Sequence, residues 1–202
     1  MVPLTVVAAG MITGLSLIVV IGAQNALVLR QGIRREHVVA VVAVCASSDL
    51  TLILAGVAGI GSLIEQAAWL IDALRWFGAV FLVAYAIACL RRATRLERIE
   101  TDARGTPTAL RVVLLHTLAL TWLNPHVYLD TVILLGSIAQ THGDTGRWWF
   151  GAGASLGSVA WFSALGFGAS RLAPVLARPR AWQILDVTIA LVMFAVAASL
   201  VW

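Results

Sequence analysis

The stretch that decides the fold covers residues 38–61, which read VVAVVAVCASSDLTLILAGVAGIG. A helix needs roughly 20 apolar residues to cross the hydrocarbon core of a bilayer, and this stretch is long enough. Its one charged residue is Asp49. An aspartate at the centre of a spanning helix costs roughly 2.5–3.5 kcal/mol on insertion scales, so such a residue usually has a function. The stretch therefore predicts a membrane-spanning helix with a polar site near its middle.

The rest of the chain has a similar composition. Of its 202 residues, 60% are hydrophobic and 12% are charged, whereas a soluble domain carries about a quarter charged residues. Long apolar segments cover about residues 3–29, 38–61, 68–90, 112–139, 148–170 and 182–202. We therefore expect a single transmembrane transporter domain over residues 1–202, with no room for a soluble catalytic module.

The basic residues predict the orientation in the membrane. All 14 are arginines, and all but Arg75 and Arg147 fall in or beside the connecting stretches 30–37, 91–111 and 171–181. Short loops rich in arginine stay in the cytoplasm. The pattern predicts that these three loops are cytoplasmic, that both termini are outside, and that the chain lies in a bacterial inner membrane. It also accounts for the high pI without a nucleic-acid partner.

The predicted fold is an all-α membrane protein with six transmembrane helices arranged as a 3+3 inverted repeat with interrupted helices. Three is odd, so the two halves enter the membrane in opposite orientations. Gly22 precedes the amides of Gln24 and Asn25 in the first half, and Asn124-Pro125 interrupts the second. Proline lacks a backbone donor and disfavours helix at the residue before it. Paired interruptions indicate a transporter's binding site, although glycine and proline are also generally frequent in membrane helices.

Polar residues beside the second interruption form a further candidate cluster. On a helix Asn124 and Tyr128 would share a face, as would His126 and Asp130. We expect these side chains to line a pathway, with hydrogen bonding between helices as the alternative. Asp49 has no arginine within a span to pair with, so it must be protonated, hydrogen-bonded or hydrated. The predicted substrate-binding residues are Gln24, Asn25, Asp49, Asn124, Tyr128 and Asp130.

A metal site is the weaker interpretation of the same residues. Cys45 and Asp49 are spaced i,i+4, as are His126 and Asp130, and such a set could hold a soft divalent metal. However, no further ligand motif completes a coordination shell. We expect no metal, no cofactor and no disulfide.

The remaining polar and small residues have simpler expected roles. Trp122 and Trp161 are expected to pack inside the protein, and the Gly153 to Gly157 spacing predicts a close helix approach. Acids near segment ends are expected in solvent or at the headgroups: Glu65, Asp72, Asp144 and Asp186.

Several motifs link the chain to a known family. In order along nearly the whole chain they are Gly22-Ala23-Gln24-Asn25-Ala26-Leu27-Val28-Leu29-Arg30-Gln31-Gly32, Ser48-Asp49, Leu74-Arg75-Trp76-Phe77-Gly78, Thr121-Trp122-Leu123-Asn124-Pro125-His126-Val127-Tyr128-Leu129-Asp130, Gly143-Asp144-Thr145-Gly146-Arg147-Trp148 and Gly166-Phe167-Gly168. With these motifs the chain resembles the L-lysine exporter family, the lysine/arginine exporters of bacteria. That family typically has Gly-Pro-Gln-Asn at the first motif, where this chain has Ala23, which removes a proline but keeps the amides. Five or six spans have been described for the family, and the arginine distribution here favours six.

The resemblance implies export of basic L-amino acids, driven by the electrochemical gradient. Moving a positive charge outward against an inside-negative potential costs about 2.3 kcal/mol per 100 mV, and exchange for an incoming proton removes that cost. We expect Asp49 and Asp130 to bind a proton and a cation alternately, while the amides bind the amino-acid backbone. The partners are then a basic amino acid, protons and the lipid bilayer, and the oligomeric state, including a homo-oligomer, stays open.

Other functions remain as alternatives at the level of sequence. Related exporters carry neutral amino acids or divalent metal cations. A passive channel is a further alternative. An enzyme is disfavoured because no nucleophile–base pair or recognised metal motif occurs.

Overall fold

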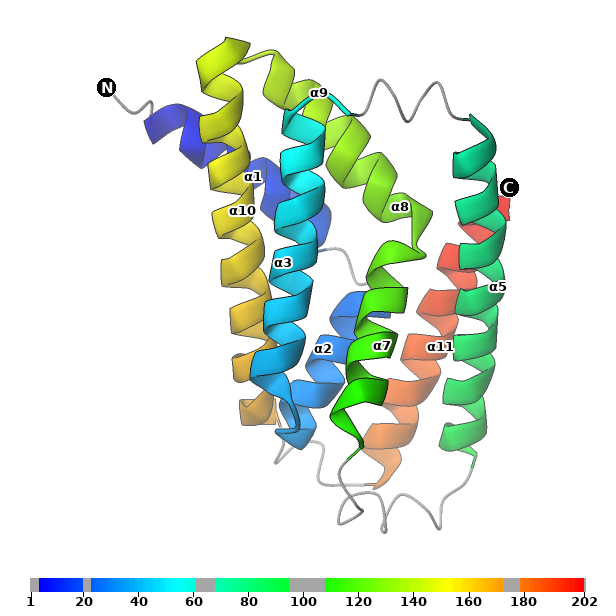
Figure 1. Ribbon diagram of the computed structural model, residues 1–202. Helices are drawn as coiled ribbons and strands as arrows, with labels where there is room; N and C mark the ends of the chain where they lie inside the picture. The colour runs from blue at the N-terminus through cyan, green and yellow to red at the C-terminus, as the bar shows by residue number, and fades with distance from the viewer. Residues whose placement is uncertain (1–3, 20–22, 61–67, 95–107, 173–178, 202) are drawn as a thin grey trace.

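The computed structural model describes residues 4–19, 23–60, 68–94, 108–172 and 179–201, which form a bundle of helices (Figure 1). In chain order the elements are α1 (Leu4–Ile18), α2 (Ala23–Arg34), α3 (Val38–Val57), α5 (Ala68–Ala93), α7 (Leu110–Trp122), α8 (Pro125–Val127), the π-helix η1 (Tyr128–Leu134), α9 (Leu135–Gln140), α10 (Gly143–Gly168), the 3-10 helix η2 (Ala169–Leu172) and α11 (Pro179–Val201). No strand occurs among the described residues. The prediction of an all-α chain is confirmed.

Two of the predicted segments are divided into shorter helices. The segment expected over residues 3–29 consists of α1 and α2, and α2 continues to Arg34. Gly22, which was expected to break the segment, lies outside the described residues. The side-chain amide Nδ2 of Asn25 donates a hydrogen bond of 2.7 Å to the carbonyl of Ile18, the last residue of α1. The sequence thus supplies a side chain that satisfies a carbonyl exposed by the end of a helix.

The other divided segment, expected over residues 112–139, has its break at Leu123–Asn124. Helix α7 ends at Trp122, and α8 begins with the backbone of Pro125. The backbone N–H of His126 turns to the Oδ1 atom of Asn124 at 3.2 Å, and the hydroxyl of Tyr128 donates to the carbonyl of Trp122 at 2.8 Å. Side chains therefore take over hydrogen bonds that an uninterrupted helix would make through its backbone.

Helices α3 and α10 have the character of membrane spans. By length and composition, Val38–Val57 and Gly143–Arg171 are long and apolar enough to cross a bilayer. Shorter apolar helices cover Leu4–Ile18, Leu110–Trp122, Tyr128–Gln140 and Asp186–Ser199. Two of these shorter helices, α1 and α7, lead directly into the breaks.

Glycines allow α1 to pack closely against α10. A Cβ atom at Gly153 would overlap the carbonyl of Val7, and one at Gly157 would lie 3.1 Å from the carbonyl oxygen of Met11. Gly10 of α1 likewise faces the backbone of Phe150. The close approach expected from the Gly153 to Gly157 spacing is confirmed.

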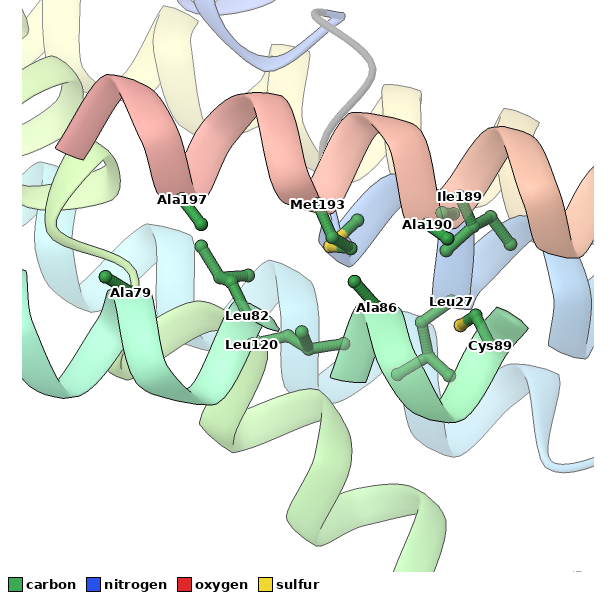
Figure 2. Packing of buried hydrophobic residues seen from close by; sticks show 11 residues of the cluster. Leu27, Ala79, Leu82, Ala86, Cys89, Leu120, Ile189, Ala190, Met193 and Ala197 are labelled. Carbon is green, nitrogen blue, oxygen red and sulfur yellow. The ribbon is translucent and has the colours of Figure 1, made fainter. Parts of the chain in front are cut away.

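Helices α5 and α11 form a separate pair within the bundle. Figure 2 shows Leu82 and Ala86 of α5 directed toward Met193 of α11, with Leu120 of α7 beside them. Cys89 is also buried in this cluster, whereas Cys45 is buried in a second cluster around α3 and α10. The two cysteines therefore lie in different clusters.

Candidate functional site

A cavity lined by several polar side chains lies where the two divided segments are interrupted. Its volume is about 320 Å³. The lining residues come from the end of α1, the start of α2, the second break, α3, α8, η1, α10 and α11: Leu17, Ile18, Gln24, Asn25, Asp49, Asn124, His126, Val127, Asp130, Thr131, Phe162, Val196 and Ser199. Figure 1 shows the end of α1 near the middle of the bundle's height, and Leu17 and Ile18 at this end line the cavity. Gln24 and Asn25 at the start of α2 and Asn124 at the second break, all predicted from sequence, therefore meet in one place.

Asp49 forms one side of the cavity, on the uninterrupted helix α3. The residue is buried, with 5% of its surface exposed. Its Oδ2 atom accepts a hydrogen bond of 2.8 Å from the hydroxyl of Ser158 on α10. This satisfies one of the three expectations for Asp49, namely hydrogen bonding to a hydroxyl. A buried carboxylate is costly unless it is paired or hydrogen-bonded, and a single hydroxyl leaves much of its capacity for a ligand.

The start of α2 adds two side-chain amides next to Asp49. The Oδ1 atom of Asn25 accepts a hydrogen bond of 3.2 Å from the indole of Trp161, while its Nδ2 atom donates to Ile18. Gln24 differs, because its Nε2 atom is buried and makes no hydrogen bond with any described residue. An amide donor with this capacity left over can bind an oxygen atom of a ligand.

The second break supplies the opposite side of the cavity. Asn124, His126 and Asp130 all line it, and α11 contributes Ser199. The Nε2 atom of His126 lies 3.1 Å from the hydroxyl oxygen of Ser199. Asp130 lies within the π-helix, a form of helix that occurs frequently at functional sites.

Tyr128 is the one predicted substrate-binding residue that does not line the cavity. Its hydroxyl donates a hydrogen bond to the carbonyl of Trp122. The expectation that it shares a helical face with Asn124 fails because Asn124 is not helical and η1 has the wider turn of a π-helix. Tyr128 supports the break instead.

Asp186 was expected at the membrane surface, and this was wrong. It is buried in α11 with 4% of its surface exposed, and its Oδ1 atom lies 3.2 Å from the guanidinium of Arg30. Arg30 in turn belongs to α2 rather than to a loop. A pairing between residues so far apart in sequence leaves no local pattern, and only the fold reveals it.

Sequence reasoning also missed Ser158 and the polar role of the tryptophans. Ser158 looks like one of many small residues in α10, and nothing in its neighbourhood singles it out. Trp122 and Trp161 were expected only to pack, yet the indole of Trp122 donates to the hydroxyl of Ser48 at 3.1 Å. A tryptophan deep in an apolar segment is a usable signal, because a buried indole N–H needs an acceptor.

The arrangement suits a cationic organic molecule better than a metal ion. Two carboxylates can attract positive charge, and amides and hydroxyls can orient the rest of a ligand. In the described part of the chain, no group of three or more His, Cys, Asp and Glu side chains is close enough together to hold a metal ion.

Interrupted apolar helices around a polar, acid-containing cavity define the class of this protein as a membrane transporter. Residues 15–202 match the family described as LysE type translocator. The chain therefore belongs to the LysE-type translocator family, which makes it a membrane transporter and not an enzyme.

Individual relatives of this chain have names that describe amino-acid transporters or exporters. A Mycobacterium tuberculosis protein named as a candidate amino-acid transporter is 49% identical over 183 residues, covering 91% of this chain and 90% of the relative. The lysine exporter LysE of Corynebacterium diphtheriae is 34% identical over 226 residues, with 98% and 99% covered. The arginine exporter ArgO of Pectobacterium carotovorum is 37% identical over 191 residues, with 95% and 94% covered. No solved structure matches the chain.

Proposed function

We propose that this transporter exports a basic L-amino acid, lysine or arginine, from the bacterial cytoplasm in exchange for protons. The observation that carries the proposal is the joint presence of Asp49 and Asp130 in one cavity together with the amides of Gln24, Asn25 and Asn124. The names of the corynebacterial and Pectobacterium relatives support the same substrates. A neutral amino acid has a single ammonium group, so one of the two carboxylates would have no cationic group of the ligand to bind.

Proton exchange follows from what a carboxylate can bind. A carboxylate accepts either a proton or a cationic group, so loss of one can accompany binding of the other. Asp49 is the stronger candidate for this exchange because it is buried, and a buried charge without a cation beside it is costly. In the proposed cycle, the amino-acid cation leaves to the outside and a proton replaces it on the carboxylate for the return.

The positions of the helix ends support the proposed orientation. The ends of α2, α5 and α10 and the start of α7 gather at the lower end of the bundle in Figure 1, and both chain ends lie in its upper half. Arg34, Arg91 and Arg111 belong to the lower ends of these elements, and Arg171 lies in η2 directly after α10, whereas Arg147 lies near the start of α10 at the other end. The proposal places the arginine-rich end in the cytoplasm and both termini outside.

Two glycine crossings support a 3+3 inverted repeat. In the first half, α2 follows the break and meets α10 of the second half at Gly32 and Gly166. In the second half, α9 follows the break and meets α3 of the first half, where a Cβ at Gly136 would lie 2.7 Å from the carbonyl oxygen of Gly56. Helices α3 and α10 each follow the divided segment of their own half, so the two crossings correspond to each other.

Efflux from proteoliposomes tests the proposed function. Vesicles containing the purified chain would be loaded with radiolabelled lysine or arginine, and efflux followed with and without an inwardly directed proton gradient. The proposal expects efflux of at least one of the two that accelerates with the gradient, and little efflux of leucine under the same conditions. Efflux at the same rate with and without the gradient would indicate a passive channel. Transport of leucine or Zn²⁺ but of neither basic amino acid would show that the proposed substrate is wrong.

A further inference from the structure

The cavity has side chains that can carry either charge, so it can bind a ligand that has both cationic and anionic groups. Among the described residues that line it, Asp49 and Asp130 can be negative, and His126 is the one side chain that can be positive. Lysine and arginine carry the reverse set, with two positive groups and one carboxylate. The side-chain amides can hydrogen-bond to groups of either charge, but they are neutral themselves. They therefore give the carboxylate of the amino acid no charged partner. His126 is the residue of the cavity able to provide one.

Hydrogen bonding fixes how His126 is used. The hydroxyl of Ser199 donates its only hydrogen to the carbonyl of Val196 at 2.8 Å. The contact of 3.1 Å between Nε2 of His126 and the Ser199 oxygen therefore requires that Nε2 be the donor. The Nδ1 atom makes no hydrogen bond with any described residue. A second proton on Nδ1 would give an imidazolium with a donor left for a ligand.

The backbone around His126 holds it in this place. Its N–H donates to the side chain of Asn124, so the break itself orients the residue. Ser199 anchors the ring from α11, on the same side of the cavity. A ligand-binding side chain needs this kind of support to contribute orientation as well as charge.

We propose that His126, positioned by Ser199, binds the α-carboxylate of the transported amino acid, while Asp49 and Asp130 bind its two cationic groups. The inference rests on the proposed function and assigns the part of the substrate that the two acids cannot recognise. It makes His126 a specificity-determining residue, because a basic molecule without a carboxylate could not make the contact with His126. A charge-assisted hydrogen bond of this kind changes affinity by about tenfold or more.

The test compares two ligands in two forms of the protein. Lysine and lysinamide differ only in the carboxylate, which is a neutral amide in the second. Their dissociation constants would be measured by calorimetry on the full chain in lipid nanodiscs, for the wild type and for His126→Gln. Glutamine keeps an N–H donor for Ser199, so the substitution preserves the link to α11. We expect the wild type to bind lysine about tenfold more tightly than lysinamide, and His126→Gln to bind the two nearly equally.

The control is His116→Gln, the same change in an exposed histidine of α7 whose ring contacts Tyr85 rather than the cavity. It should keep the wild-type preference. Equal affinities in the wild type, or a His126→Gln variant that weakens both ligands by the same factor, would overturn the inference while lysine export stands. Wild-type protein that binds neither ligand would overturn the proposed function itself, and the inference with it.

Discussion

Asp49 and Asp130 line the same cavity, but Asp49 lies on an uninterrupted α-helix and Asp130 on a π-helix. Asp49 is buried and held by Ser158 of the neighbouring helix. Asp130 is only partly buried, and it shares its side of the cavity with His126 and Ser199. The first carboxylate is thus fixed within packed helices, while the second lies in a segment built around a break.

The difference indicates a division of labour between the two sides. A buried carboxylate that is charged and has no cation beside it costs free energy. A fixed, buried carboxylate therefore favours a state in which either a proton or a cation is bound to it. A carboxylate in an interrupted segment is better placed to accommodate ligands of different length. Four substitutions test this comparison.

Replacing Asp49 with asparagine should have the largest effect. The carboxylate disappears while size is retained, so a bound cation would face a buried site without its counter-charge, at a cost of about 3–5 kcal/mol. Gradient-driven efflux of arginine from proteoliposomes should fall by about a hundredfold or more. Asp144→Asn, at an exposed acid of the first turn of α10, is the matched control and should transport normally. Full coupled export by Asp49→Asn would remove Asp49 from the mechanism.

Replacing Asp130 with asparagine should have a smaller effect. Asp130 is partly exposed, so its charge is better screened and its loss should weaken arginine binding by about tenfold. The half-saturating arginine concentration in the same efflux assay measures this. Proton-driven acceleration should persist in Asp130→Asn and be lost in Asp49→Asn. If the two variants behave identically, the division of labour is wrong.

The crossing of α3 and α9 tests whether the two sides need a fixed spacing. A Cβ at Gly136 would lie 2.7 Å from the carbonyl oxygen of Gly56, so Gly136→Ala must push the helices apart. Overpacking of this kind costs about 1–3 kcal/mol and should lower the unfolding temperature of the purified protein. Gly168→Ala is the control, because a Cβ there meets nothing within 4 Å. An unchanged unfolding temperature in Gly136→Ala would mean that the crossing can relax freely.

The smallest effect is expected from Ser158→Ala. Among the described residues, Ser158 has the one hydroxyl that donates to Asp49, and the change removes it while keeping nearly all of the volume. A hydrogen bond of this type contributes about 0.5–1.5 kcal/mol, so the half-saturating arginine concentration should change by about threefold to tenfold. Ser155 is one turn away and its hydroxyl donates to the Gly151 carbonyl, so Ser155→Ala should have no such effect. Equal behaviour of the two variants would show that Ser158 does not position Asp49.

The local chemistry of the chain was enough to predict much of this cavity. Apolar length predicted helices, and the Asn124-Pro125 step predicted a break, because proline acts on its immediate neighbours. The acids and amides stood out because polar groups in apolar segments require a reason. These are properties of a few adjacent residues, and they can be recognised without knowing the fold.

Contacts between distant segments could not be predicted in the same way. Ser158 of α10 donates to Asp49, and Ser199 of α11 contacts His126, yet each serine looks ordinary within its own helix. The extended π-helix at Tyr128–Leu134 also has no simple sequence signature. Tyr128, at the start of this π-helix, does not line the cavity, whereas Asn124 and Asp130 do.

The ion pair between Arg30 and Asp186 has a consequence for biosynthesis. The two residues are 156 positions apart, and at about 5–20 residues per second a ribosome needs about 8–30 s to cover that distance. For this interval the first half of the protein already exists while the helix that carries Asp186 has not been made. The joining of these two charges is therefore among the last steps of maturation, and a nascent chain stopped before α11 can never complete it.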